Sequence, residues 1–592
     1  MNKVVFIYII CAISAFSCDS KLDRIVKSNP NLSTFYSEYD SDKQKRKSLH
    51  FLVANATDYD IGLLHIDSLK VNIDLAYDRW TSVDWGKSYD QDLFQEYVLP
   101  MRVSNEPLEY YWRSDILKKI AIDGDSKDVR SVAEQINKQI KINMSLNLRQ
   151  SSLLGYKKTI QGDYGKCDDR AVLTTMALRA YGVPAAFDYV PYWGNTNSGH
   201  SVCSAILPND SIILFQSHSN APSDRELNYK TPKVYRRTYT LQGGSSIFKY
   251  GKRESVPPIF SQHRFIDVTS QHAIGVTDVT VEIDVLHKNK LLYLSVFSPN
   301  NWQAIAYAKR QGNVATFFDI GTGVNDIGES PSKCKNIGDG ILYLPCFYDN
   351  GDIIPAANPI IVSESGIRSI KCDNQNRETI ILHRKYPLRQ RIIAYADEMK
   401  GGRIEGANTS DFSDSKELHY IFQTPESRLQ HVDIESDIPF KYIRYYKPSG
   451  VFSIAELRAL DAKQNIIKGS KFTMPLLKDV SDLDNITDGD ALTYYSLSGI
   501  VNVWSGLEFA KPSKIRHIEF APRNDDNAIS PGDMYELFYW DGEWMSLGRK
   551  VATQYTLKYD NVPKGALLWL RNITRGREER PFTYENDCQI WW

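Results

Sequence analysis

Apolar and polar positions along the first third of the chain predict helices. Five apolar residues lie three or four positions apart, as on one face of a helix: Val129, Val132, Ala133, Ile136 and Ile140. The polar run at 123–126 supplies a start for this helix. The pattern therefore predicts an amphipathic helix with one buried stripe.

A second helix is predicted to begin at Cys167. Four apolar residues share one side of it: Ala171, Val172, Met176 and Ala180. Gly182 followed by Pro184 ends the helix, and the apolar run 185–190 then predicts a strand.

Beyond Pro257 and Pro258 the period of the pattern changes to two, which is typical of strands. Short strands and turns continue to about Leu388 and predict a β-sandwich. A polar stretch at 401–415 comes next, and strands rich in Tyr and Trp return from about Val432 to Trp592. We expect a multidomain α+β protein with an irregular or helical lead-in at 18–105, a mixed core at 106–235, a β-sandwich at 262–420 and a jelly roll at 432–592.

Length and charge narrow the classes of function. The chain has 592 residues, enough for several domains, and its 71 Lys and Arg balance 72 Asp and Glu. That balance leaves no surplus positive charge for a phosphate backbone, so we expect no nucleic-acid partner.

The first residues have the features of an export signal. Lys3 precedes an apolar run from Val4 to Phe16, and Cys18 follows a small residue. This arrangement resembles a bacterial lipoprotein signal at 1–17, with Cys18 as the lipidated residue. The resemblance implies a protein of the cell envelope, anchored to the outer membrane by lipid alone; an ordinary signal peptide cut nearby is the alternative.

The remaining cysteines form no metal-binding pattern. After Cys11 and Cys18 are set aside, none of the others makes a CxxC pair or a zinc-finger spacing with histidine: Cys167, Cys203, Cys334, Cys346, Cys372 and Cys588. A single bridge between Cys334 and Cys346 remains open. We expect no metal and no cofactor.

Cys167 differs from the other cysteines because a glycine-rich loop, 161–166, runs directly into its helix. Unpaired backbone N–H groups and the positive end of the helix dipole favour a thiolate at such a position. Lys166 acts in the same direction, whereas Asp168 and Asp169 oppose it as like charges.

A base for this sulfur is offered by His200, at the start of a predicted hairpin with its turn at 208–210. With a three-residue loop, His200 lies opposite His218, and Gln216 is its diagonal neighbour. Gln216 or His218 could then orient His200 from behind.

Residues 165–171, the helix end at 179–185 and the Gly199-His200 pair together resemble the transglutaminase-like core of the papain-like cysteine superfamily. The lead-in at 94–113 resembles that of exported transglutaminase-like lipoproteins from Bacteroidetes. The resemblance implies that Cys167 is the nucleophile, His200 the base, and Gln216 the residue at the orienting position.

Two positions depart from that family's pattern. Gln216 stands where a carboxylate is expected, and Val202 stands where a tryptophan usually follows the histidine. An amide can hold an imidazole by a hydrogen bond but cannot stabilise imidazolium by charge. Gln161 matches the spacing of the oxyanion-hole glutamine in papain-like enzymes, with a solvated loop residue as the alternative.

The C-terminal region resembles a discoidin-like, galactose-binding-like jelly roll, on the segments 485–490, 504–509 and 514–518. That family often binds glycans through loops at one end of the sandwich. A polar loop could meet sugar hydroxyls or Ca²⁺ here: Arg523, Asn524, Asp525, Asp526 and Asn527. Alternatively, the aromatic residues fill the sandwich and the Asp-Gly pairs form turns.

Two functions follow from these resemblances. The first is an envelope lipoprotein that cleaves or transfers acyl groups from amides of a protein, peptide or glycoprotein substrate through a thioester at Cys167. The second is an inactive transglutaminase-like scaffold that binds glycan or protein at the surface; Gln216 favours it.

Overall fold

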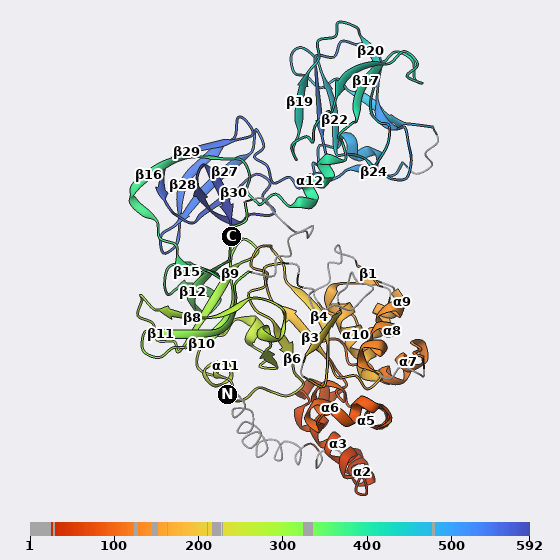
Figure 1. Ribbon diagram of the computed structural model, residues 1–592, viewed down its shortest axis with the longest axis vertical. Coiled ribbons are helices and arrows are strands. Elements are labelled where there is room, and N and C mark those ends of the chain that lie inside the picture. Colours follow the sequence, from red (N-terminus) through yellow and green to blue (C-terminus); the bar gives the residue numbers. More distant parts are fainter. Residues whose placement is uncertain are drawn as a thin grey trace. The chain divides into compact units, whose positions relative to one another are not determined.

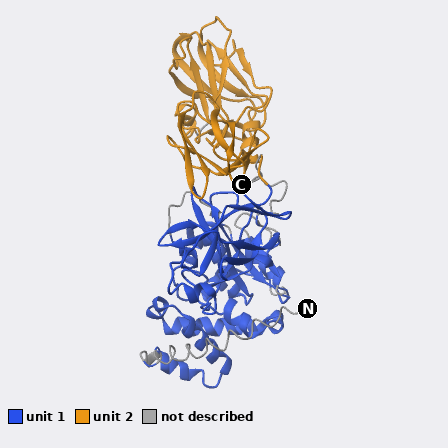
Figure 2. Cartoon of the chain, turned by 90° about the vertical axis from the view of Figure 1, so that its left-hand side faces the viewer, with its two compact units in different colours: residues 1–325, 339–370 blue, residues 326–338, 371–592 orange. Residues whose placement is uncertain are grey.

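The computed structural model describes residues 25, 27, 30–123, 128–140, 142–144, 152–162, 164–209, 211–215, 227, 229–323, 336–475 and 480–592. The expected signal peptide and Cys18 lie outside this range. The protein is multidomain α+β, with a helical N-terminal region and several antiparallel sheets (Figure 1). It divides into two compact units, Met1–Asn325 with Asp339–Ile370, and Asp326–Gly338 with Lys371–Trp592 (Figure 2).

The lead-in is helical. Its elements are α2 (Pro30–Glu38), α3 (Lys43–Asn55), α4 (Asp58–Gly62), α5 (Ile66–Ser82), η1 (Asp84–Ser88) and α6 (Gln91–Tyr97). Asp42 and Asp90 cap α3 and α6 by accepting hydrogen bonds from backbone N–H groups of the first turn. These helices share one core, which includes Leu49, Leu69, Ile73 and Phe94.

The next part of the first unit is a five-stranded sheet with helices packed against it. The strand order is β5-β4-β3-β6-β7, with β3 (Ala185–Val190), β4 (His200–Ile206), β5 (Ile212–Phe215), β6 (Tyr235–Arg237) and β7 (Phe265–Asp267). The helices are α7 (Trp112–Lys119), α8 (Val129–Gln139), α9 (Tyr156–Gly162) and α10 (Cys167–Ala180). Short elements complete this part: β1 (Asn143–Met144), β2 (Tyr164–Gly165), α11 (Ser246–Tyr250), η2 (Pro258–Phe260) and η3 (Thr269–Gln271).

The structure confirms both predicted helices, with one difference. Helix α8 begins after Asp128, whose side chain caps it, and its predicted stripe is buried. In α10, by contrast, every residue from Asp169 to Ala180 is buried. The helix contacts α7, α8 and α9 as well as β3 and β4 (Figure 1), so it has no solvent face.

The predicted hairpin is also present. Strands β4 and β5 pair antiparallel, with Ile206 opposite Ile212 and Cys203 opposite Phe215, which is the register of a three-residue loop. Gln216 and His218 lie outside the described residues, so the expected pairing of His200 with His218 stays a prediction.

Two further sheets of the first unit pack on one core that includes Val279, Phe317, Leu294 and Tyr343. One sheet joins β8 (Val276–Glu282) and β11 (Val314–Gly321). The other has the order β10-β9-β12-β14-β15, with β13 on β12. Its strands are β9 (Leu291–Phe297), β10 (Trp302–Lys309), β12 (Ile341–Asp349), β13 (Asp352–Pro355), β14 (Ile360–Ser363) and β15 (Gly366–Ser369).

The second unit contains two β-rich cores. The first lies between the sheets β18-β17-β20-β25-β23 and β19-β26-β22. Its elements are α12 (Gln390–Asp397), β17 (Arg403–Ala407), β18 (Lys416–Tyr420), β19 (Gln430–Asp433), β20 (Phe440–Lys447), β21 (Phe452–Ile454), β22 (Glu456–Leu460), β23 (Gly469–Thr473), η4 (Leu483–Thr487), β24 (Tyr495–Leu497), β25 (Val503–Ser513) and β26 (His517–Ala521). The polar stretch at 401–415 supplies β17 to this sandwich, so the domain limits expected at 420 and 432 fall within one core.

The second core unites the sheet β28-β27-β30-β31-β32 with the pair β16-β29. Its strands are β16 (Asp373–Leu382), β27 (Met534–Trp540), β28 (Trp544–Val551), β29 (Leu557–Lys564), β30 (Leu568–Asn572), β31 (Pro581–Glu585) and β32 (Cys588–Trp591). Within the described part of the chain, no helix is both long and apolar enough to cross a membrane.

Candidate functional site

The start of α10 is held by a carboxylate at its third position. Asp169 accepts hydrogen bonds from the backbone N–H of Lys166 at 2.9 Å and of Leu154 at 2.7 Å. An acidic residue suits this position, because it satisfies N–H groups that the helix leaves unpaired. Asp169 thereby ties the loop before the helix to the helix itself and determines where Cys167 lies.

Cys167 is the first residue of α10 and is partly buried. Burial raises the pKa of its thiol to about 12, and the charge of Asp168 adds to this, while a backbone N–H of Ser201 acts in the opposite direction. The thiol donates to Oδ1 of Asp168 at 3.7 Å. Burial, which the sequence does not show, therefore acts against the expected preference for thiolate.

Helix α10 packs against β4, which begins at His200. The backbone N–H of the next residue, Ser201, lowers the pKa of the Cys167 thiol. His200 pairs with Val190 of β3. A Cβ at Gly199 would lie 2.4 Å from the carbonyl oxygen of Pro191, so only glycine fits before His200.

The aromatic neighbour of His200 is Trp193, which the sequence analysis did not single out. Its ring stacks on the imidazole with centroids 5.7 Å apart and planes at 26°. Trp193 is buried in a small core with Val190 and Val202. The indole thus limits the orientations open to the His200 imidazole.

The structure describes only one of the two glutamines of the predicted site. Gln161 lies in the last turn of α9 with its side chain exposed. Gln216 is outside the described residues. Their proposed roles, oxyanion donor and orienting group, remain predictions.

A cluster of buried charged and polar side chains lies on the same sheet. Asp188 of β3 accepts two hydrogen bonds from Arg236, at 2.8 and 2.9 Å, and one from Ser204 at 2.6 Å. His272 Nε2 lies 3.1 Å from the same carboxylate. Arg236 and His272 together hold the pKa of Asp188 well below its usual range, against the effect of burial. Sequence reasoning missed this cluster, because its members are 16 to 84 residues apart.

A cavity of about 780 Å³ in the first unit opens near β6, β7, β10 and β11 and is lined by Lys233, Asp267, Tyr307 and Phe317, among others. Neither Cys167 nor His200 is among the described residues that line it. The cavity and the cysteine are separate features.

The side chains of the polar loop at 523–527 contact other residues of the second unit. Arg523 lies over the rings of Tyr395 and Tyr494. Asp525 accepts hydrogen bonds from Arg384 at 2.6 and 2.7 Å. Asn527 is buried and accepts a hydrogen bond from Lys385 at 2.5 Å.

Asn524 is also buried and lines a cavity of about 510 Å³. Arg428, Glu456, Arg458 and Tyr555 line the same cavity, a charged and aromatic set suited to polar ligands.

No family model and no curated protein matches the chain. Among solved structures, part of the chain is similar to LapG of Legionella pneumophila, at 15% identity and a TM-score of 0.17, over 27% of this chain and 82% of that one. The calcium-bound form matches at 16% identity and 0.17, over 28% and 82%. Red sea bream transglutaminase matches at 8% identity and 0.17, over 78% and 71%. TM-scores of this size do not establish the fold or activity of this chain.

Proposed function

We propose that this chain is a cysteine-dependent acyl-transfer protein in which Cys167 is the nucleophile and His200 the base. The observation that carries the proposal is the packing of α10, which begins at Cys167, against β4, which begins at His200. The Gly199 backbone and the stacked Trp193 support the same assignment, since they restrict how His200 is presented.

The raised pKa of the Cys167 thiol bears on the first chemical step of this proposal. A thiol with a pKa of about 12 must lose its proton as it attacks, so His200 acts as general base in that step. The sulfur forms a bond to the amide carbonyl carbon, the C–N bond breaks, and the amine leaves with the proton from His200. Water then attacks the thioester, which releases the acid and restores the thiol.

In this proposal the chain is exported and tethered through Cys18, so its substrates are proteins, peptides or glycoproteins of the envelope or its surroundings. Water is the acyl acceptor that is always present there, which favours hydrolysis over transfer. The second unit would hold the substrate, and the cavity near Asn524 suits a polar group such as a glycan.

The alternative is an inactive scaffold that binds protein or glycan. The high pKa of Cys167 and its contact with Asp168 favour this alternative, because a nucleophile is ordinarily activated in the opposite direction.

A bridging reagent distinguishes the two. With 1,3-dibromoacetone, a sulfur and an imidazole nitrogen in contact are joined through the same three-carbon unit. We expect peptide mass spectrometry of the treated protein to find Cys167 joined to His200. In His200→Gln the bridge should be lost, whereas His287→Gln, a histidine stacked on Phe347 elsewhere in the unit, should keep it. Alkylation of Cys167 without a bridge, or a bridge to another histidine, would contradict the assignment.

A further inference from the structure

The outer face of the sheet β19-β26-β22 carries a group of metal-ligating side chains. His431 and Asp433 alternate along β19 and so project on one side. In the antiparallel register His431 lies opposite Glu519 and Asp433 lies opposite His517. Two neighbouring strands therefore present two imidazoles and two carboxylates on one face.

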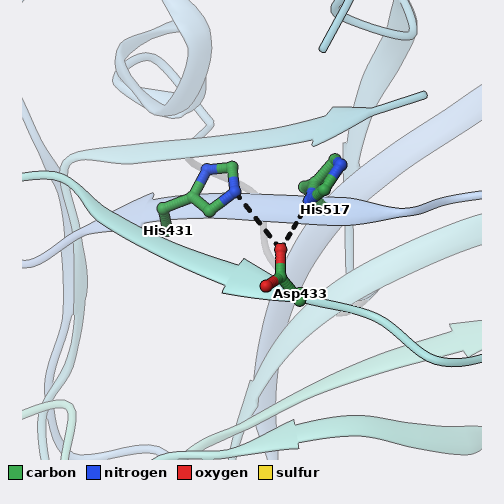
Figure 3. A group of neighbouring side chains, drawn as sticks. All are labelled: His431, Asp433 and His517. Atoms are coloured by element: carbon green, nitrogen blue, oxygen red, sulfur yellow. Dashed lines mark hydrogen bonds and ion pairs between the residues drawn. The ribbon is translucent and has the colours of Figure 1, made fainter. Parts of the chain in front are cut away.

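Both imidazoles approach the same oxygen atom (Figure 3). His517 Nδ1 lies 2.7 Å from Asp433 Oδ1, and His431 Nε2 lies 3.5 Å from it. One ligand atom from each of the three residues falls within 4.8 Å of the others. The two rings are 4.9 Å apart between centroids, and one nitrogen of each converges on Asp433 Oδ1.

The second nitrogen of each imidazole also has a polar neighbour. His431 Nδ1 lies 3.5 Å from Glu519 Oε1, and His517 Nε2 lies 3.1 Å from the Gln464 amide. In metal sites the imidazole nitrogen that does not bind the ion donates its N–H to a carboxylate, a carbonyl or water, and Glu519 is such an acceptor for His431. The Gln464 atom near His517 is the amide nitrogen, which donates. The arrangement is therefore more specific than three polar side chains that happen to be neighbours.

We propose that His431, Asp433 and His517 bind one divalent transition-metal ion, with Glu519 orienting the imidazole of His431. Two imidazoles with one carboxylate suit Zn²⁺, Co²⁺, Ni²⁺ or Cu²⁺, whereas Ca²⁺ and Mg²⁺ prefer oxygen ligands throughout. His431 and Asp433 are exposed, so the remaining coordination positions face water. Because the ligands come from two strands, the ion would join β19 to β26.

The test is titration of the full chain with Zn²⁺ by calorimetry. We expect one ion to bind per chain. His431→Ala and His517→Ala should each weaken Zn²⁺ binding by at least roughly tenfold, because loss of even a residue that only orients a metal ligand weakens binding by about that much. Zn²⁺ should also raise the melting temperature of the protein, because an ion that binds only the folded state stabilises it.

The matched control is His383→Gln, which removes another exposed histidine of the same unit and should leave the affinity unchanged. Co²⁺ provides a second readout, because thiolate ligands would add an intense charge-transfer band that imidazole and carboxylate ligands lack. Equal Zn²⁺ affinity in the protein and in the His431→Ala/His517→Ala double variant, or a thiolate band with Co²⁺, would overturn the proposal. Circular dichroism checks that the variants are folded.

Discussion

At Cys167, opposing influences act on one sulfur atom. The helix start and the Ser201 N–H favour the thiolate, whereas burial and the Asp168 carboxylate disfavour it, and the second pair prevails. The local sequence revealed the helix start and the aspartates, but the extent of burial depends on the strands that cover the residue. Reactivity at this residue is therefore sensitive to the charge beside it.

Replacement of Asp168 by asparagine should speed alkylation of Cys167. Removal of the negative charge lowers the pKa of the thiol, and each unit of decrease gives roughly ten times more thiolate at neutral pH. The rate of iodoacetamide labelling at pH 7, followed by mass spectrometry, measures this, with the exposed Cys588 as internal reference. Asp168→Glu keeps the charge and should label at the original rate; equal rates in the two variants would contradict the explanation.

Among the elements, β3 connects the site to the buried charges of the sheet. Asp188 on β3 joins Arg236 on β6 and Ser204 on β4, so three adjacent strands share one carboxylate. Helix α10 lies against β3 and β4 of this sheet. A buried pair of this kind is costly to break, because the remaining charge has no partner and no water.

Asp188→Asn should lower the free energy of unfolding of the first unit by about 3–5 kcal/mol, because Arg236 is left buried and unpaired. Urea denaturation followed by circular dichroism measures the change. Since the pKa of Asp188 is lower in the folded state, its contribution should be constant above the usual value of about 4 and decline as the pH falls below it.

Glu38→Gln is the control for this prediction. It removes a partner from the exposed ion pair of Glu38 with Lys70 and should cost less than about 1 kcal/mol. If Asp188→Asn cost no more than Glu38→Gln, the buried cluster would not stabilise the sheet.

For the whole molecule, stability is divided among separate cores. The first unit holds the core around α10, the lead-in core and the core between its two further sheets, and the second unit holds the two β-rich cores. Because each unit buries its own apolar side chains, damage to one core acts first on the unit that contains it.

Ile136→Ala and Leu537→Ala test this division, since each removes a fully buried side chain, one in each unit. Each should cost about 2–5 kcal/mol and should lower the unfolding transition of its own unit in differential scanning calorimetry. An equal shift of all transitions by either variant would show instead that the units unfold together.

The sequence by itself determined the elements that local chemistry specifies. The 3.6-residue period of 129–140, the helix start at Cys167 and the turn at 208–210 predicted α8, α10 and the β4–β5 hairpin correctly, because capping, periodicity and turn chemistry are properties of neighbouring residues. Only the tertiary structure decided what depends on residues far apart: the burial that raises the pKa of Cys167, the Asp188 cluster, and the approach of His431 to His517. Burial and convergent charges arise when separate strands pack, and no local pattern records them.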